Sequence, residues 1–325
     1  MPQMINVLIT SIGRQTDLAA AFREVLQGKG KVLAADADET APGLAAADKA
    51  LISPSWRSDD YIAWLLDVCS DHCVRMLLSL HETDLSILEA HREQFEAEGV
   101  AMLGSPRLPV DVVIDKFQMS RQLSKFGVAT PPTYLAQNVV SGEAMIEDGP
   151  IIVKPRTGRG SSGLESLSST KELRPLLEFR TDESHIVQPQ IKGQEYGMDV
   201  VNDFDGQFRG ALVRRKLRMR NGETDRAETI HDDTFVRIAQ KVARCTRHRG
   251  VFDIDLMVGQ DGPLIIDINP RFGGGYMFNH IAGANAPAAL VNWLNGTDQS
   301  TDLLKYEAGV VSQRLSPVRR VSFSK

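Results

Sequence analysis

The segment 251–276 carries side chains with a recognisable chemistry. Alternating residues precede a short turn, and the apolar run 264–266 follows it, a pattern that predicts a pair of antiparallel strands. Asp267 and Asn269 are two residues apart and therefore share a face of the second strand, and Asp255 or Asp253 lies opposite on the first. Carboxylate and amide oxygens are the ligands that Mg²⁺ prefers. The segment predicts a magnesium site; the structural alternative is a polar hairpin end with a capping aspartate.

Arg271 follows directly after these predicted metal ligands. A guanidinium beside a metal ion suits phosphate or carboxylate groups. The segment 273–287 is rich in glycine and leads into a helix predicted at 288–294, whose N-terminus would favour an anion. The pattern indicates an anionic substrate group beside the metal.

Lys154 lies on a short apolar strand that is followed by a glycine-rich loop at 157–163. The loop has the pattern Gly-x-Gly-x-x-Gly, but it lacks the Gly-Lys-Ser/Thr ending of a Walker loop and the helix that follows a dinucleotide loop. The later motifs of protein kinases are also missing. A flexible hairpin over phosphates remains, with a mobile surface hairpin as the alternative. Its candidate phosphate donors are Gly158, Gly160, Ser161, Ser162 and Gly163.

This combination resembles the ATP-grasp superfamily, especially the branch near the large-subunit domains of carbamoyl-phosphate synthase. That family reads acid-x-Asn-Pro-Arg at its metal-binding end, where this chain has the same run at 267–271 with aspartate in place of the commoner glutamate. The spacing to the turn glycine favours Asp255 over Asp253 as the earlier ligand. The resemblance covers roughly residues 108–294, and the preceding part of the chain agrees in type.

The resemblance implies ATP-binding roles for residues that carry little signal of their own. Lys116 matches a phosphate-binding cation at a helix start, although any helix has exposed lysines. Gln188 and Gln190 match a hinge whose main-chain groups recognise adenine. Glu195 matches the glutamate that holds the ribose hydroxyls, with a solvent-exposed glutamate as the alternative.

Catalytic roles follow from the same resemblance. Lys154 is expected to neutralise phosphate charge, and Arg271 to stabilise charge on the transferring group. A basic run within 210–220 adds a further candidate. Arg214 or Lys216 is expected to face the triphosphate or the acceptor, while the other basic side chains are exposed.

The elements that position these residues predict an α/β protein. Apolar strands alternate with helices in the first hundred residues, which predicts a parallel sheet in a Rossmann-like domain. Helices are also expected at 84–98, 111–126 and 232–247. After the first domain the resemblance implies an ATP-grasp fold, in which α+β subdomains clamp ATP. We expect a Rossmann-like pre-ATP-grasp domain at 1–108, a small subdomain with the glycine-rich loop at 109–184, and a C-terminal subdomain with the metal site at 185–325.

The carboxyl ends of the N-terminal strands are candidate ligand contacts, and the resemblance implies that such a preceding domain contributes to the acceptor-substrate side. They include Ser11, Gly13, Asp36 and the segment 81–84, and ligands of open α/β sheets bind at that edge. Helix capping explains these polar residues equally well. No Gly-x-Gly-x-x-Gly follows the first strand, so NAD binding there is unsupported.

The composition narrows the class of partner. The 325 residues include 37 Lys and Arg and 42 Asp and Glu, a net charge of −5, so nucleic acid and anionic membranes are poor partners. No apolar run approaches the ~20 residues of a membrane span, and the N-terminus lacks the pattern of a signal peptide. The 3 cysteines are expected to be buried, reduced thiols. We expect a cytoplasmic protein, and a homodimer is compatible with these properties.

The resemblance implies an ATP-dependent carboxylate–amine ligase that uses Mg²⁺, with Mn²⁺ as a substitute. Such enzymes phosphorylate a carboxylate, and an amine attacks the acyl phosphate to give an amide or peptide bond, ADP and phosphate. The expected partners are small-molecule carboxylates and amines. Phosphoryl transfer requires positioning and charge neutralisation more than a nucleophile. The alternatives are phosphorylation of bicarbonate or carbamate without amide formation, as in carbamoyl-phosphate synthase, and a non-catalytic nucleotide-binding regulator.

Overall fold

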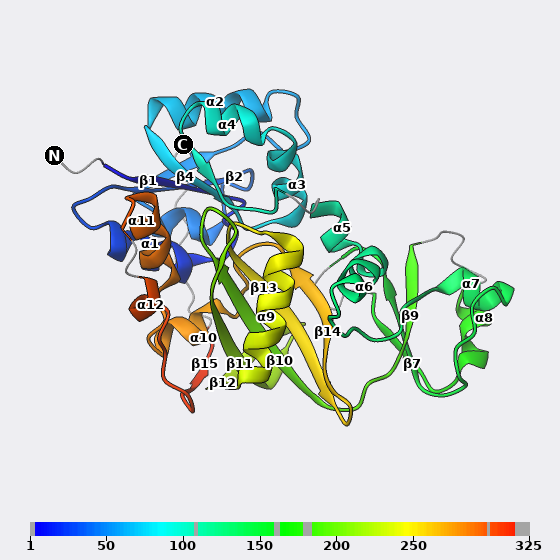
Figure 1. Cartoon of the computed structure of the whole chain (residues 1–325). Helices are drawn as coiled ribbons and strands as arrows, with labels where there is room; N and C mark the ends of the chain where they lie inside the picture. Colours follow the sequence, from blue (N-terminus) through cyan, green and yellow to red (C-terminus); the bar gives the residue numbers. More distant parts are fainter. Residues whose placement is uncertain (1–3, 107–109, 159–162, 178–183, 298–299, 316–325) are drawn as a thin grey trace.

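A parallel sheet forms the N-terminal part of the molecule (Figure 1). The computed structural model describes residues 4–106, 110–158, 163–177, 184–297 and 300–315. The sheet has the strand order β3-β2-β1-β4-β5, which confirms the predicted Rossmann-like arrangement. Its strands are β1 (Asn6–Thr10), β2 (Val32–Asp36), β3 (Lys49–Ile52), β4 (Val74–Ser79) and β5 (Ala101–Met102). The connecting helices are α1 (Thr16–Leu26), the 3-10 helix η1 (Pro42–Ala46), α2 (Tyr61–Asp71), α3 (Glu82–Ala90) and α4 (Arg92–Ala97).

The single helix predicted at 84–98 is wrong, because the chain turns at His91 between α3 and α4. The turn brings Arg92 inward, where it pairs with Glu89 at 2.7 Å and donates to the carbonyl oxygen of Met102 at 2.9 Å. A continuous helix would not direct that side chain to the end of β5. The break therefore reflects a tertiary contact that no local pattern reveals.

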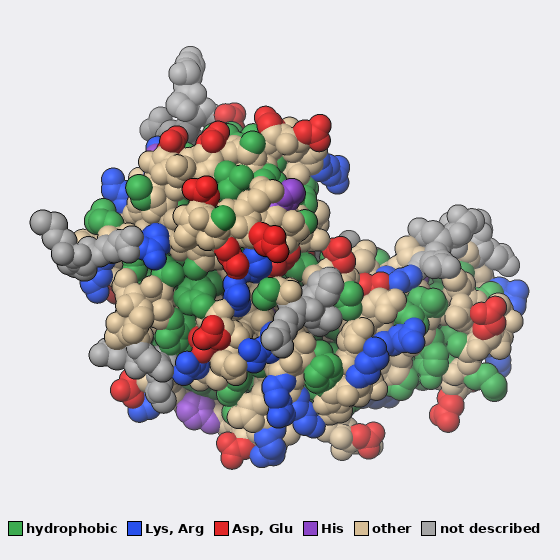
Figure 2. All heavy atoms as spheres, turned by 45° about the horizontal axis from the view of Figure 1, so that its top comes forward, with side chains coloured by type: hydrophobic (Ala, Val, Ile, Leu, Met, Phe, Trp, Pro, Cys, Tyr) green, Lys and Arg blue, Asp and Glu red, His purple; other side chains and the backbone are tan. Residues whose placement is uncertain are grey.

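An antiparallel sheet of order β6-β9-β7-β8 forms a lobe beside the main body. Figure 1 shows this lobe at the right with α7 and α8 on its outer side, and in Figure 2 a hollow separates it from the N-terminal part. Its elements are β6 (Tyr134–Leu135), α7 (Ala136–Ser141), β7 (Ile151–Pro155), β8 (Glu165–Leu167), the 3-10 helix η2 (Thr170–Glu172), α8 (Leu173–Leu177) and β9 (His185–Pro189). We call these elements the small lobe.

The helix predicted at 111–126 is also divided, into α5 (Val110–Ile114) and α6 (Lys116–Lys125). Asp115 leaves the helical conformation and caps α6, since its side chain accepts from the backbone N–H groups of Phe117 at 3.0 Å and Gln118 at 3.2 Å. Side-chain capping of this kind satisfies donors that a helix start leaves unpaired. The break places Lys116 at the first position of α6.

The C-terminal part is built on an antiparallel sheet of order β14-β13-β10-β11-β12-β15. Its strands are β10 (Gln194–Asn202), β11 (Phe208–Arg220), β12 (Glu223–Ile230), β13 (Gly250–Gly259), β14 (Gly262–Asn269) and β15 (Val311–Gln313). Its helices are α9 (Asp233–Thr246), α10 (Tyr276–Ile281), α11 (Ala286–Leu294) and α12 (Ser300–Leu303). The sequence patterns missed β12 and α10. We call this sheet the large sheet; α9 covers one of its faces (Figure 1).

The N-terminal sheet and the large sheet share a hydrophobic core, whereas the small lobe has a core of its own. One core joins α1, β1 and β2 to residues of the large sheet and α11, and the Phe22 and Phe272 rings meet edge to face with centroids 6.0 Å apart. The small lobe instead has its own compact core around Ile151, Val153 and Val187. Within the described residues, no helix is long and apolar enough to cross a membrane.

Candidate active site

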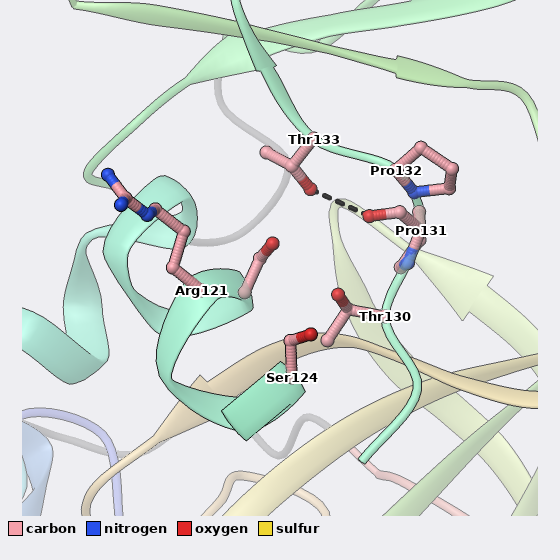
Figure 3. A pocket seen from close by; sticks show the side chains of 7 residues that line it. Arg121, Ser124, Thr130, Pro131, Pro132 and Thr133 are labelled. Atoms are coloured by element: carbon pink, nitrogen blue, oxygen red, sulfur yellow. Dashed lines mark hydrogen bonds between the residues drawn. The ribbon is translucent and has the colours of Figure 1, made fainter. Parts of the chain in front are cut away.

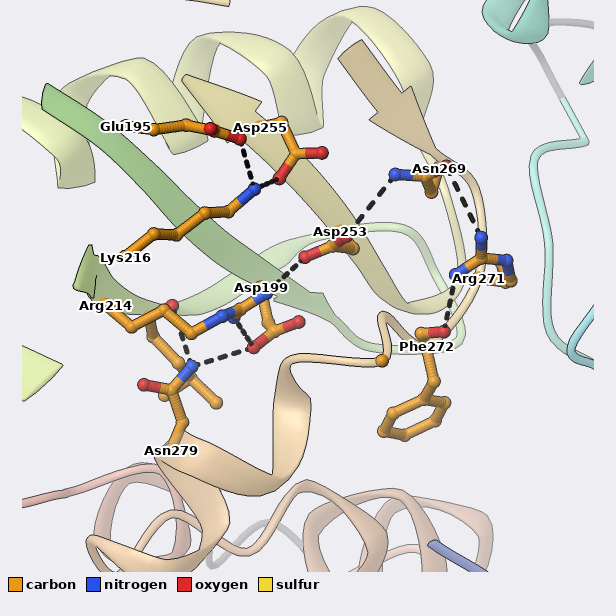
Figure 4. Close-up of polar contacts among 12 residues, drawn as sticks. Glu195, Asp199, Arg214, Lys216, Asp253, Asp255, Asn269, Arg271, Phe272 and Asn279 are labelled. Atoms are coloured by element: carbon orange, nitrogen blue, oxygen red, sulfur yellow. Dashed lines mark hydrogen bonds and ion pairs between the residues drawn. The ribbon is translucent and has the colours of Figure 1, made fainter. Parts of the chain in front are cut away.

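The large sheet has one apolar face and one charged face. Ile254 packs under α9, whereas its neighbours Asp253 and Asp255 point to the opposite side, as strand alternation requires. The register places Asp253 opposite Asn269 and Asp255 opposite Asp267. The four predicted ligand positions therefore share a face of this hairpin. Figure 4 shows three of them, Asp253, Asp255 and Asn269, among their polar neighbours.

Arg214 lies buried on this face and joins carboxylates from two strands. Its Nη1 is 2.5 Å from Asp199 Oδ2 and its Nη2 is 2.5 Å from Asp253 Oδ1, with 1% of its side chain exposed. Asn279 donates to the same Asp199 oxygen at 2.8 Å. Burial by itself would lower the pKa of Arg214, but the carboxylates outweigh burial and raise that pKa, so the guanidinium stays charged. Asp253 is thus engaged by a buried arginine.

Glycines pack against this buried charge cluster because a side chain would not fit. A Cβ on Gly197 in β10 would lie 2.8 Å from the Arg214 guanidinium carbon, and a Cβ on Gly275 would lie 2.4 Å from Arg214 Nε. A Cβ on Gly273 would lie 2.4 Å from Asp253 Cγ. Close approach to the cluster therefore accounts for Gly273 and Gly275, which precede α10.

Lys216 bridges two further carboxylates on the same face (Figure 4). Its Nζ is 2.6 Å from Glu195 Oε1 and 2.6 Å from Asp255 Oδ1, and its side chain is almost fully buried. Burial would lower the pKa of Lys216, but Asp255 and Glu195 outweigh burial and raise it. Both predicted cations of β11 thus face the site; Arg214 is enclosed, while Lys216 contacts a predicted metal ligand and the predicted ribose ligand.

Two more lysines approach Asp267 from the small-lobe side. Lys116 Nζ is 3.3 Å from Asp267 Oδ1 and donates to the carbonyl oxygen of Gly158 at 2.8 Å. Lys154, on β7, donates to the carbonyl oxygen of Ile266 at 3.4 Å. Burial lowers the pKa of Lys154 to about 8; Lys116 adds to this effect, while Asp267 and Asp255 oppose it. Burial also raises the pKa of the Asp267 carboxyl, although both lysines oppose that change.

The donor set of this face fits Mg²⁺. Asp255 and Asp267 lie opposite each other and already attract positive charge, which Lys216 and Lys116 supply. In the described part of the chain, no group of at least 3 His, Cys, Asp or Glu side chains converges as a metal site. Magnesium usually takes one or two carboxylates and completes its shell with water and substrate phosphates. A pair of carboxylates with a neighbouring amide matches that requirement.

Asn269 and Arg271 continue this face toward the N-terminal part. Asn269 Nδ2 donates to Asp253 Oδ2 at 3.3 Å, and Arg271 Nη2 donates to Asn269 Oδ1 at 3.4 Å. Arg271 also pairs with Glu82, the first residue of α3, with Nη2 at 2.5 Å from Oε1. Arg271 therefore stands between the predicted metal ligands and the N-terminal sheet.

The other candidates at the edge of the N-terminal sheet form hydrogen bonds within or between the neighbouring loops and helix starts. Gly13 donates its N–H to Asp36 Oδ2 at 2.8 Å. Ser11 donates to Asp84 Oδ2 at 2.9 Å. The side chain of His81 accepts from the backbone N–H of Thr83 and thereby caps α3. Of the predicted strand-end residues, Glu82 is the one that we find in contact with a predicted site residue within the described part of the chain.

The predicted adenine hinge joins the small lobe to the large sheet. Gln188 lies in β9, and its side chain donates to Thr133 Oγ1 at 2.8 Å. The N–H of Gln190 donates to the carbonyl oxygen of Pro150 at 2.9 Å, so at Gln190 it is the carbonyl group, and not the N–H, that could meet a base. Glu195 follows in β10 and is held by Lys216.

The glycine-rich loop is described only at its ends. Gly158 and Gly163 have φ of +132° and +71°, backbone conformations that favour glycine. The predicted phosphate donors between them lie outside the described residues; these are Gly160, Ser161 and Ser162.

A pocket of about 400 Å³ lies between α6 and the segment 130–133, as Figure 3 shows. Ser120, Arg121 and Ser124 line it from the helix, and Thr133 donates to the carbonyl oxygen of Pro131 at its other side. Of the predicted site residues that the structure describes, none lines this pocket. Its link to the site is indirect, through the hydrogen bond between Gln188 and Thr133.

The sequence patterns missed Asp199 and Asn279, which complete the Arg214 cluster. Asp199 lies four residues after Glu195 on the same face of β10, so strand alternation could have identified it. Asn279 lies in α10, a short helix that follows the glycines. No pattern in the sequence brings it to β10.

Comparison with known proteins adds family information to this geometry. Residues 113–275 match the ATP-grasp domain family, and residues 7–103 match the PylC-like N-terminal domain. A D-alanine–D-alanine ligase from Corynebacterium aurimucosum is 27% identical over 147 residues, which span 42% of this chain and 39% of that protein. The arginine-specific large chain of carbamoyl phosphate synthase from Bacillus subtilis is 21% identical over 199 residues, or 55% of this chain and 18% of that protein. Each match spans well under two thirds of the relative's own length.

The fold also resembles a solved enzyme structure. N5-carboxyaminoimidazole synthetase from Staphylococcus aureus, complexed with ADP, superposes with a TM-score of 0.74 at 13% identity, covering 93% of this chain and 80% of that one. At this level of identity the similarity establishes the fold. It includes the N-terminal parallel sheet, the small lobe and the large sheet.

Proposed function

The chain belongs to the ATP-grasp family, and we propose that it is an ATP-dependent ligase that joins a carboxylate to an amine and releases ADP and phosphate. The observation that carries the proposal is the meeting of three buried or partly buried lysines with Asp255 and Asp267. These lysines come from α6, β7 and β11. Preorganised cations around carboxylates suit phosphoryl transfer, which requires charge neutralisation more than a covalent residue.

We propose that Asp255, Asp267 and Asn269 hold Mg²⁺, and that the bound ion would neutralise phosphate charge. Asp255 is preferred to Asp253 because Arg214 and a glycine enclose the Asp253 carboxylate. The donor set consists of hard oxygens, so Mn²⁺ is the natural substitute. The ammonium groups of Lys216 and Lys116 would then leave these carboxylates and meet the triphosphate.

ATP is proposed to bind between the small lobe and the large sheet. Lys154 and Lys116 lie on the small-lobe side and would neutralise phosphate oxygens. The main chain at Gln188 and Gln190 would receive the adenine, and Glu195 would hold the ribose once Lys216 releases it. The glycine-rich loop would close over the phosphates with its backbone N–H groups.

Arg271 is proposed to act on the group that is transferred. A carboxylate substrate attacks the terminal phosphorus, ADP leaves, and the acyl phosphate forms; the amine then attacks its carbonyl carbon and phosphate leaves. The guanidinium of Arg271 would stabilise charge on the transferring phosphoryl group, or orient the carboxylate before attack. Both roles require a guanidinium that is held in a fixed orientation.

The function is tested by ADP release from MgATP in the presence of pairs of amino acids and of aminosugars. A D-alanine pair is the first probe because a relative is a D-alanine–D-alanine ligase, and bicarbonate with ammonia separates the carbamoyl phosphate chemistry. Lys154→Met and Asp267→Asn should each lower the rate by on the order of 10²–10³. Near-full ADP release by either variant at saturating ATP would contradict the assignment.

The acyl phosphate is tested separately with hydroxylamine. With the active carboxylate and no amine, hydroxylamine should yield a hydroxamate in step with ADP. Transfer of ¹⁸O from the labelled carboxylate to phosphate during full turnover checks the same step when the closed site excludes hydroxylamine. ADP formation without hydroxamate and without ¹⁸O transfer would refute the acyl phosphate mechanism.

A further inference from the structure

Arg271 is held by a carboxylate from a distant part of the chain. Its Nε donates to Glu82 Oε1 at 2.8 Å, and its Nη2 lies 2.5 Å from the same oxygen. The side chains are only 14% and 11% exposed. Two N–H groups of the guanidinium converge on one carboxylate oxygen in a largely buried contact, which restricts the orientation of the arginine side chain.

The remaining donors of Arg271 are also largely committed. Its Nη1 donates to the carbonyl oxygen of Phe272 at 3.0 Å, and its Nη2 also reaches Asn269 Oδ1 at 3.4 Å. A guanidinium has five N–H groups. Within the described residues these contacts leave one N–H on Nη1 without an acceptor. The structure thus presents a single donor in a fixed direction beside the predicted metal ligands.

Glu82 lies in a helical turn that is held to the N-terminal sheet by buried hydrogen bonds. It is the first residue of α3, and two residues separate it from the end of β4 at Ser79. Asp84 in the same turn is fully buried and accepts hydrogen bonds from Thr10 at 2.6 Å, Ser79 at 2.8 Å and Tyr61 at 2.8 Å. These bonds fasten the first turn of α3 to β1, β4 and α2. Glu82 is therefore a fixed anchor for Arg271.

We propose that Glu82 is a positioning residue for phosphoryl transfer, which acts through Arg271 by holding its guanidinium in the orientation that presents the remaining Nη1 N–H to the transferring group. The inference rests on the proposed role of Arg271 in the ligase reaction. It also gives the N-terminal part of the chain a direct share in that step. Without the anchor, Arg271 keeps its charge but loses its direction.

Substitutions of Glu82 separate position from charge. Glu82→Gln keeps an oxygen acceptor of the same reach and loses the charge, whereas Glu82→Ala removes both. If orientation matters, the alanine variant should lose about 10- to 100-fold in kcat, since a misplacement near 1 Å can cost that much. The glutamine variant should recover most of the rate, and KM for MgATP should change little in either.

The chain offers a matched control. Glu96 pairs at 2.5 Å with Arg249, the residue before β13, and among the described residues it contacts no predicted site residue. Because the Glu96 pair is more exposed than the Glu82 pair, Glu96→Ala should lower the thermal midpoint less than Glu82→Ala does, and it should leave kcat unchanged. Equal losses of kcat in both alanine variants would show that Glu82 matters only for the stability of the fold, and this result would overturn the proposal.

A double-substitution cycle tests whether Glu82 acts through Arg271. In the Arg271→Ala background, adding Glu82→Ala should lower kcat by less than about twofold, because there is no guanidinium left to orient. The rates are measured as ADP release with the most active substrate pair from the functional screen. A further loss as large as in the wild-type background would refute the proposed dependence.

A spectroscopic readout keeps the two proposals distinguishable. In ¹⁵N-labelled protein, the Nε–H signal of Arg271, assigned by its absence in Arg271→Lys, should be protected from exchange. Protection should persist in Glu82→Gln and disappear in Glu82→Ala. A wild-type protein that releases no ADP would refute the proposed function, whereas an Nε–H that stays protected in Glu82→Ala would refute the anchoring by Glu82.

Discussion

The pH dependence of ATP use provides a direct test of the role of Lys154. Burial lowers the pKa of this lysine to about 8 from its usual 10.5. If its ammonium group meets the phosphates, the reactive form of the free enzyme is the protonated one. The protonated fraction is ~90% at pH 7 and ~10% at pH 9 for such a pKa. We therefore expect kcat/KM for MgATP to fall about tenfold over that interval, since this parameter reports the free enzyme.

Titration of Lys154 also changes the stability of the protein with pH, but in the direction opposite to the expected loss of rate. Because the folded-state pKa of Lys154 is depressed, the unfolded chain binds more protons between about pH 8 and 10.5. The free energy of unfolding therefore rises with pH in that window as far as Lys154 contributes. Lys154 therefore makes the protein more stable at pH 9 than at pH 8. A loss of rate at pH 9 cannot come from that stability change, so it reports on ATP use.

The assay measures initial rates of ADP release at ATP concentrations well below KM, from pH 6.5 to 10 at constant ionic strength. Lys154→Arg is the control, because arginine stays protonated throughout this range. Its absolute rate will differ, but its profile should lack the decline above pH 8. A wild-type profile that is flat to pH 10, or a decline of equal size in Lys154→Arg, would refute the reasoning.

Other contacts give further expectations. Lys216→Met should strengthen Mn²⁺ binding without nucleotide, because Lys216 Nζ lies 2.6 Å from Asp255 Oδ1, a proposed metal ligand. The free-Mn²⁺ EPR signal measures this, and Lys241→Met, at an exposed lysine, should change nothing. Equal affinities would show that Lys216 does not compete with metal. Gly275→Ala should lower the free energy of unfolding by about 1–3 kcal/mol or more, since its Cβ would lie 2.4 Å from Arg214 Nε. Urea unfolding measures the loss, and Gly149→Ala, with nothing within 4 Å of its Cβ, should have no steric penalty; matching midpoints would contradict the packing argument.

The sequence predicted the features that depend on local periodicity. Strand alternation placed Asp255 and Asp267 on one face, and the register confirms that they lie opposite each other. It could not show that Asp253 is engaged, because that depends on Arg214 from a strand that is not a neighbour of β13. Pair contacts across a sheet are set by register and bulges, which the residues of one strand do not specify.

The elements that were missed have physical explanations. β12 carries Asp225 and Thr229 at buried positions, so it lacks the apolar alternation by which a strand is usually identified. Asp225 is instead paired with Arg218 of β11. The break at Asp115 is a capping event in the middle of an amphipathic pattern, and such a pattern does not reveal whether a side chain turns back onto the backbone.

The core that joins α1 to α11 has a consequence for how the molecule comes apart. Leu18 and Phe22 on α1 are buried against a cluster that includes Phe272 and Leu290, so a chain ended after β5 would expose an apolar helix face. The N-terminal sheet and the large sheet should therefore open as one cooperative unit. The small lobe, with a separate and smaller core, should open at a lower free energy and exchange its amide hydrogens first. Partial unfolding would then separate Lys154 from the carbonyl oxygen of Ile266 before the remaining carboxylate face is disturbed.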